Sequence, residues 1–482
     1  MTLRRVLSVA VLCAAIVLAT ATQASTNPSE LHKVVPHATG VPTLYQAVVR
    51  RCQVLIGHGH QPWCGELSSQ PGFKRSPTVA QAALQGIREF ADPTHGVGLS
   101  DQGPLDWRWN YSTGLWGGHS LQHWWQSAMA MRTLVRYLEV THNTDPAYQQ
   151  ILLRTYHRES GHIPGETPFA IAKDDFVNAF LDDTAWWGLT WLEASKYELN
   201  DRHDLTDAQT FLNLAEYDAD YISKQQKSCG GIEWQIGFPS DTVTNAEYIS
   251  LVAELATYRN QPGPFHDPAK ASMWMGQAQA TLSWLESHKL IDLRTGKVHD
   301  TLNAACNGLV GGPITYTQGE VAEALVQVGT ALHDSSYYQD ADQFLKYAFS
   351  KDAAMVNSKG ILQEPCERAT NGCTGTILYF DELSWKGILV QAFLDYTTAT
   401  GSTEYRSFLR RQAVAIVHNA IARSDGRPGN CQTPDSCQFV FYWGWPLTPS
   451  RSPFVNHATQ MDALDALTAA LAVPANAPPK TF

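Results

Sequence analysis

Apolar residues recur at helical spacing over most of the chain from Pro77 onward. Residues three and four positions apart share one face of a helix, so this pattern predicts a series of helices. Several of these segments open with Asp, Ser, Thr or Asn, the residues that cap helix N-termini. The predicted helices cover residues 79–91, 120–141, 145–159, 181–199, 207–224, 245–259, 268–288, 317–333, 337–349, 381–400, 403–422 and 457–472.

The connections between these helices offer few candidates for strands. Runs such as CQFVFYW are short, so we expect no large sheet. Several connections are long and rich in Trp, Tyr and Gly, namely DWRWNYSTGLWGGHS, CGGIEWQIGFPSD and NAACNGLVGGPITY. Long loops in a compact domain usually carry function. About a dozen helices without a proline-rich linker predict one all-α domain, a toroid of helical hairpins. The alternative is an open α-solenoid, which would show a fixed-period repeat in the sequence, and no such repeat is found.

The first 24 residues differ from the rest of the chain. Arg4 and Arg5 precede the apolar run VLSVAVLCAAIVLAT, and small residues follow up to about Ala24. The run is shorter than the roughly 20 residues that span a bilayer, which favours a cleaved secretory signal over a membrane anchor. We therefore expect a secreted protein, extracellular or periplasmic, that does not contact a membrane once the signal is removed.

The remaining chain divides by composition into three parts. Residues 25–76 are polar and contain proline, which predicts a short N-terminal arm. Residues 77–475 hold all predicted helices and form the single domain, and residues 476–482 form a polar C-terminal tail.

Cysteines support an oxidising compartment. Nine are present, and eight remain after the signal, an even number that suits disulfides. Short spacings favour Cys52 with Cys64, Cys366 with Cys373 and Cys431 with Cys437, which leaves Cys229 for Cys306, although eight cysteines allow many other connectivities. We expect no metal, because neither paired CxxC motifs nor regular Cys/His spacing is present, and HGH at 58–60 suits a surface loop better than a metal site.

The charge of the chain restricts its partners. The formal net charge is −11, which disfavours nucleic acid and anionic membranes and accommodates neutral or cationic ligands. We expect a monomer that needs no cofactor.

The segment FLDDTAWWGLTWLEA places Asp182 and Asp183 one turn before Trp186 and Trp187 at a predicted helix start. Adjacent aspartates at a helix start usually cap it. An apolar wall beside two like charges has another effect, since it pushes one carboxyl toward the protonated form while its neighbour stays ionised. Such a pair can act as general acid and nucleophile in glycoside hydrolysis, with retention of configuration when the carboxyls lie about 5 to 5.5 Å apart.

Aromatic residues also favour a sugar-binding cleft. The chain has 15 Trp and 18 Tyr, and six Trp and Tyr crowd together between 107 and 125 in a segment that also contains Gly and Asn. Tryptophan is seldom fully buried because its N–H needs a partner, so such a cluster favours a cleft over core packing. The sequon NYS at 110–112 falls in this cluster, and a glycan on Asn110 would argue against a cleft there.

Several segments resemble glycoside hydrolase family 76, the endo-α-1,6-mannanases. They are HWWQSAMAMRTLVRY, LDDTAWWGLTWLEA, CGGIEWQ, NAEYISLVAELA, TYTQGEVAEALVQV and FDELSWKGILVQAFLDY, in the family's order and spanning residues 77–471. The resemblance implies an (α/α)6 barrel and a retaining endo-α-1,6-mannanase with Asp182 as nucleophile and Asp183 as acid/base. It also implies substrate contacts from residues in the matching motifs: Trp125, Gln126, Trp187, Trp234, Asn245, Tyr316 and Gln318. Two features depart from the family pattern: Glu233, where an apolar or aromatic residue is common, and the cysteine-bearing arm.

Two other functions are compatible with these residues. A cell-wall mannan transglycosidase would use the same chemistry and pass the glycosyl unit to another sugar. A non-catalytic glycan-binding protein of an uptake system would use the aromatic cleft alone, but binding does not require two adjacent like charges.

Overall fold

The structure is a computed structural model, and it describes residues 78–91, 109–110, 115–116, 124–159, 176–225, 227–368, 381–421, 437–444 and 457–473. The chain divides into residues 1–73 and 74–482, and all described residues belong to the second unit. The predicted signal, arm and C-terminal tail lie outside the described residues and stay predictions. Most of the aromatic cluster before Trp125 and the side chain of Asn110 also lie outside the described residues.

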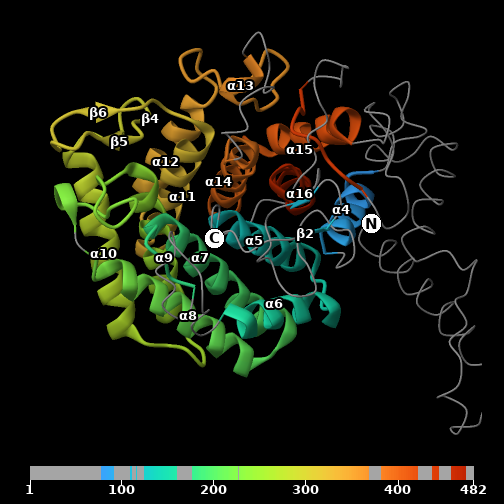
Figure 1. Cartoon of the computed structure of the whole chain (residues 1–482), viewed down its shortest axis with the longest axis horizontal. Coiled ribbons are helices and arrows are strands. Elements are labelled where there is room, and N and C mark those ends of the chain that lie inside the picture. The colour runs from blue at the N-terminus through green and yellow to red at the C-terminus, as the bar shows by residue number, and fades with distance from the viewer. Residues whose placement is uncertain are drawn as a thin grey trace, which may run out of the picture. The chain divides into compact units, whose positions relative to one another are not determined.

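The described residues are mainly helical, as the apolar pattern predicts (Figure 1). The α-helices are α4 (Val79–Ala91), α5 (Trp124–Thr141), α6 (Pro146–Glu159), α7 (Leu181–Tyr197), α8 (Leu205–Ser223), α9 (Thr242–Asn260), α10 (Pro268–Ser287), α11 (Thr315–Leu332), α12 (Ser335–Tyr347), α13 (Pro365–Arg368), α14 (Trp385–Thr400), α15 (Arg406–Ala415) and α16 (His457–Ala472). Short π segments, η3 (Glu198–Arg202) and η7 (Ile416–Ala420), follow α7 and α15, and the 3-10 turns are η4 (Ser228–Gly230) and η6 (Asp381–Ser384). The predicted helix over 381–400 is therefore a 3-10 turn followed by an α-helix.

Strands are short, as expected. Three antiparallel pairs occur among the described residues: β1 (Trp109–Asn110) with β2 (Leu115–Trp116), β3 (Ile291–Asp292) with β4 (Lys297–Val298), and β5 (Thr301–Leu302) with β6 (Leu309–Val310). The segment CQFVFYW forms only an isolated bridge between Phe439 and Ile421. Its aromatic side chains are buried, so the apolar run reflects core packing rather than a sheet.

Six helices form a closed inner ring. Each helix contacts the next in the order α5, α7, α9, α11, α14 and α16, and α16 packs back on α5. α7, α9, α11 and α14 are buried along almost their whole length, including many polar side chains. Helices buried on all sides do not show a strong amphipathic pattern, which is why their inner position could not be read from periodicity.

The remaining long helices lie outside the ring. α8 packs on α7, α10 on α9, α12 on α11, and both α4 and α15 on α16. Figure 1 shows α8 and α10 on the outer side of α7 and α9. These paired layers give the all-α (α/α)6 barrel. None of the described helices is both long and apolar enough to cross a membrane.

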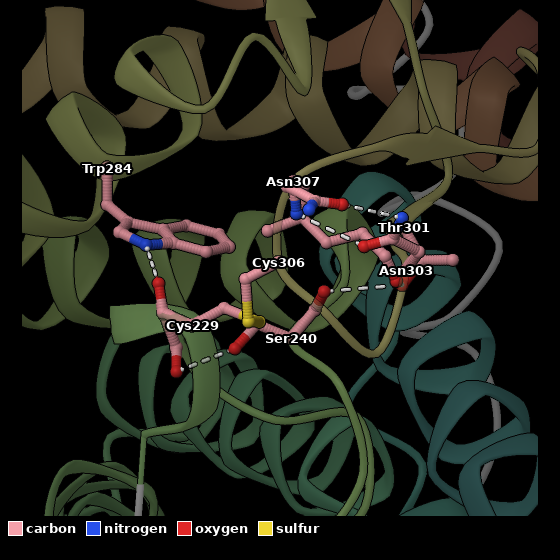
Figure 2. The surroundings of a disulfide bond; sticks show 9 residues. Cys229, Ser240, Trp284, Thr301, Asn303, Cys306 and Asn307 are labelled. Atoms are coloured by element: carbon pink, nitrogen blue, oxygen red, sulfur yellow. Dashed lines mark hydrogen bonds between the residues drawn. A yellow bond between two sulfur atoms is a disulfide. The ribbon is translucent and has the colours of Figure 1, made fainter.

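A disulfide joins two loops at one end of the barrel. Cys229 and Cys306 are bonded, with their Cα atoms 5.3 Å apart, which confirms the predicted pair (Figure 2). Cys366 and Cys437 each take part in a disulfide as well. Their expected partners, Cys373 and Cys431, lie outside the described residues.

Candidate active site

Helix α7 begins differently from its neighbours. α8, α9, α10 and α12 each start after an aspartate whose side chain accepts a backbone N–H of the first turn. The residue before α7 is Phe180, which provides no such cap. Asp182 and Asp183 lie inside the first turn. The Asp182 carboxyl accepts backbone N–H groups of that turn, but both carboxyls also bond to groups outside the helix, so helix capping alone does not account for this pair.

Asp182 faces the loop before α9. The indole Nε1–H of Trp234 donates to Asp182 Oδ2 over 2.9 Å. Oδ1 has no hydrogen-bond partner among the described residues. The side chain is nearly buried, with 7% of its residue surface exposed, so the carboxylate has little water to stabilise its charge.

Asp183 faces the start of α5. The side-chain amide of Asn178 donates to Asp183 Oδ2 over 2.8 Å. A backbone hydrogen bond from Trp125, in the first turn of α5, also reaches this carboxyl. Helix N-termini favour negative charge, so the start of α5 favours the ionised form of Asp183.

The pKa values of both carboxyls are raised. Burial raises the pKa of Asp182 to about 7, against hydrogen bonds from the backbone N–H groups of Asp182 and Asp183 and from Trp234. Burial and the charge of Asp182 raise the pKa of Asp183 well above its usual range. The charge on each carboxyl disfavours the ionised form of the other, so the two do not titrate independently.

The two aspartates line a cavity of about 650 Å³. Among the residues predicted from the sequence as substrate contacts, Trp125, Trp234 and Tyr316 line it too. Tyr316 stacks on Trp385, with ring centroids 6.1 Å apart and planes within 10°, and it also contacts Trp125 at 5.9 Å. These rings form a continuous aromatic wall beside the carboxyls.

Four predicted contacts lie behind this wall instead: Gln126, Trp187, Asn245 and Gln318 are fully buried and do not line the cavity. Trp187 packs between Phe176, at 4.7 Å, and Trp191, at 5.8 Å. Trp186 rather than Trp187 faces the wall, since its ring stacks on Tyr316 at 6.4 Å. Adjacent helix residues point about 100° apart, so only Trp186 packs against the wall, and neither ring lines the cavity itself.

The three amide side chains hold loops. Asn245 donates to the carbonyl oxygens of Ile232 and Asp241 over 2.8 and 2.6 Å, and Gln318 donates to those of Gly296 and Phe344 over 2.5 and 2.9 Å. Gln126 donates to Ser384 Oγ over 3.2 Å. Such amides satisfy buried backbone groups, so the motif positions are explained by loop anchoring.

Sequence reasoning missed several cavity residues. Asp241, Asp300 and Asp381 add three carboxyls, and Phe180, Phe238 and Trp385 add aromatic surface. Asp381 and Trp385 belong to FDELSWKGILVQAFLDY, and Asp241 is the last residue of the aromatic loop CGGIEWQIGFPSD. The loops were recognised, but their orientation toward the cavity depends on the closed ring.

The cavity, the paired carboxyls and the helical barrel define the class as a glycosidase-like (α/α)6 protein. The family model for glycosyl hydrolase family 76 matches residues 101–481. The chain belongs to glycosyl hydrolase family 76. Within the described residues, no group of three or more His, Cys, Asp or Glu has the arrangement of a metal site.

Similar proteins agree with this family. Mannan endo-1,6-alpha-mannosidase DCW1 of Candida glabrata is 23% identical over 316 residues, which are 63% of this chain and 65% of that protein. An inactive variant of the α-1,6-mannanase GH76A of Salegentibacter sp. HEL1_6, in complex with α-1,6-mannotriose, has a TM-score of 0.58 and 16% identity, over 82% of this chain and 99% of that one. Dfg5 from Chaetomium thermophilum in complex with glucosamine has a TM-score of 0.60 and 19% identity, over 82% and 90%. At these identities the solved structures show the shared fold.

Proposed function

We propose that this protein is a secreted, monomeric hydrolase that cleaves internal α-1,6-mannosidic bonds of mannan with retention of configuration. The observation that carries the proposal is the pair Asp182 and Asp183, which lines an aromatic-walled cavity and bonds to groups outside its helix. The names of the similar mannosidase and mannanase support the substrate. The inactive Salegentibacter variant has asparagine at two consecutive aspartates, which supports the roles of the pair.

In the first step Asp182 acts as the nucleophile. Its carboxylate attacks the anomeric carbon and forms a covalent glycosyl ester, while Asp183 donates its proton to the departing glycosidic oxygen. The higher pKa of Asp183 suits the acid, and the hydrogen bond from Trp234 supports the ionised form of Asp182. In the second step Asp183 takes a proton from water, which attacks the ester and restores both carboxyls.

The aromatic wall suits the substrate. Sugar rings present C–H faces that pack against Trp and Tyr, and Trp125, Tyr316 and Trp385 provide such faces next to the carboxyls. The cavity holds carboxyls that accept hydrogen bonds from sugar hydroxyls, and hydroxyl-rich, uncharged mannan does not add like charge.

The test is digestion of debranched α-1,6-mannan by the wild type, Asp182→Asn and a control, Asp340→Asn, on the outer helix α12. We expect the wild type and control to release short oligosaccharides, and proton NMR at early times to show the α-anomer first. Asp182→Asn should lose at least about 10³-fold in kcat, because removal of a nucleophile removes the covalent route. Normal activity of this variant, or early β-anomer, would contradict the proposed mechanism.

Transglycosylation is the second candidate, because it would use the same two carboxyls and the same covalent intermediate. The same glycosyl-Asp182 ester would then react with a sugar hydroxyl instead of water. Products longer than the starting oligosaccharide, formed at high acceptor concentration, would support this function. Binding of mannan without turnover, unchanged by Asp182→Asn, would instead support a non-catalytic glycan-binding protein.

A further inference from the structure

Trp234 makes the two oxygens of Asp182 unequal. Its indole N–H holds Oδ2, and this is the one side-chain hydrogen bond to Asp182 in the part of the chain that the structure describes. Oδ1 has no hydrogen-bond partner there. A carboxylate with one oxygen fixed is oriented, and its second oxygen is available to react.

The backbone around Trp234 is paired with the segment that leads into α7. The N–H of Leu181 donates to the carbonyl oxygen of Trp234 over 2.8 Å, and the N–H of Ile236 donates to that of Ala179 over 2.9 Å. The ring of Phe180 meets Trp234 edge-on at 5.2 Å. The indole of Trp234 and the carboxylate of Asp182 are therefore attached to two backbone segments that are hydrogen-bonded to each other.

Glu233 stabilises the turn that presents Trp234. Its carboxylate, on a residue only 1% exposed, accepts the backbone N–H of Gly237 over 2.6 Å. Gly237 has φ of +90°, a conformation that side chains with Cβ rarely adopt. This accounts for a buried acid at a position where the family commonly has an apolar or aromatic residue: the carboxylate closes the turn at 233–237.

The far side of the loop is tied to its neighbours (Figure 2). The disulfide links Cys229 to Cys306, and the indole of Trp284 donates to the carbonyl oxygen of Cys229 over 2.9 Å. Ser240 Oγ donates to the carbonyl oxygen of Gly231 over 2.9 Å. The loop is thus fixed on both sides of Trp234, although Trp234 itself is 38% exposed.

The titratable groups that interact with Asp182 among the described residues are acidic. They come from its own helix, from the start of α9, from α11 and from η6: Asp183, Asp241, Glu247, Tyr316 and Asp381. Negative neighbours and burial disfavour the ionised form of Asp182, whereas N–H donors favour it. The backbone N–H groups of Asp182 and Asp183 are such donors, and Trp234 is the side chain that adds to them.

We propose that Trp234 is a positioning residue for Asp182: its indole N–H orients and charges the nucleophile, and the turn closed by Glu233 holds the indole in place. This rests on the proposed function only in naming Asp182 the nucleophile. A sugar-stacking role for the exposed ring is compatible with it, but the N–H makes a separate contribution that can be measured.

The test compares Trp234→Phe with Trp284→Phe, which removes an indole N–H of α10 that donates to Cys229 of the same loop and does not bond to Asp182. Both are checked for folding by circular dichroism. The pH dependence of kcat/KM on α-1,6-mannan is then measured for each. Loss of the indole donor should raise the pKa of Asp182 by about one unit. The acid limb of the kcat/KM profile should move to higher pH by the same amount, and kcat/KM at pH values below the limb should fall about tenfold. Trp284→Phe should keep the wild-type limb.

A direct readout separates this inference from the proposed function. Carboxyl carbon NMR of Asp182, assigned by comparison with Asp182→Asn, gives its titration without substrate. An upward shift in Trp234→Phe supports the positioning role even when mannan is not cleaved. An unchanged titration together with an unchanged acid limb, and only KM raised, would show that Trp234 is merely part of the cavity wall and would overturn the proposal.

Discussion

The side-chain amide of Asn178 bridges the start of α7: it donates to Asp183 Oδ2 over 2.8 Å and accepts the backbone N–H of Phe180 over 2.7 Å. One amide therefore connects the backbone just before the helix to the second aspartate of its first turn. Because both ends of the amide are bonded, its orientation is fixed, and so is that of the carboxyl.

Replacement of Asn178 by alanine should weaken catalysis through Asp183. The hydrogen bond favours the ionised carboxyl, so its loss should raise the pKa of Asp183 further, move the alkaline limb of kcat/KM to higher pH and lower kcat about tenfold. Steady-state kinetics from about pH 4 to about pH 10 measure the limb and kcat, because carboxyl and phenol groups titrate over roughly this range. Asn303→Ala, in the β5 region, is the control; an unchanged limb would argue that Asn178 only supports the loop.

Replacement of Asp182 by asparagine should stabilise the fold at neutral pH while it removes activity. The folded pKa of Asp182, about 7, lies above the ordinary value of 3.8, so its favourable contribution is complete below about pH 4 and is lost as pH rises through 7. We expect the variant to melt about 2 °C or more above the wild type at pH 8. At pH 4 the two proteins should melt at the same temperature. Calorimetry at both pH values checks this, and an equal difference at both would show that Asp182 is not strained by burial.

Replacement of Trp385 by alanine should weaken substrate binding. Its ring stacks on Tyr316 at the cavity, so loss of the stacking surface should raise KM for mannan oligosaccharides about tenfold, with a smaller effect on kcat. Phe349→Ala is the matched control, because Phe349 is also exposed and stacked, on Tyr405 at 6.3 Å, away from the cavity residues. A similar rise in KM for both variants would point to general destabilisation.

Replacement of Arg132 by methionine should destabilise the barrel. Arg132 of α5 is 2% exposed, donates Nε to Glu193 of α7 over 2.9 Å and pairs with Glu323 of α11. Removal leaves buried carboxylates with less compensation, so urea unfolding should show a loss of about 3 to 5 kcal/mol. Lys346→Met, which breaks a half-exposed pair with Asp342 on α12, should cost about 1 kcal/mol or less.

The same ion cluster predicts how the wild type responds to acid. Burial alone would raise the pKa of Glu193, but Arg132 and Arg136 lower it to about 2. Its contribution to stability is therefore complete above its ordinary value of 4.5 and is lost as pH falls toward 2. The free energy of unfolding of the wild type should fall over this range more steeply than that of Arg132→Met, and equal slopes would contradict the assignment.

Much of the site could be predicted because its chemistry is local. Asp182 and Asp183 stand out as adjacent like charges before two tryptophans, and Trp125, Trp234 and Tyr316 stand out in aromatic motifs. All five line the cavity. Motif membership could not tell which residues line it, since Trp125 lines the cavity whereas its neighbour Gln126 is fully buried behind it.

By itself the sequence determined the helices, the shortness of the strands among the described residues and the candidate acids, because each depends on nearby residues or on composition. It favoured the Cys229–Cys306 pair only by elimination, since these residues are 77 positions apart. Only the tertiary structure decided that α16 closes on α5, that Asp241, Asp300 and Asp381 reach the same cavity, and that Gln126, Asn245 and Gln318 anchor loops behind it. The physical reason is that ring closure brings together loops far apart in the chain. Which face of a buried helix meets a cavity depends on packing against its neighbours, and a helix buried on all sides carries little of that information in its own pattern.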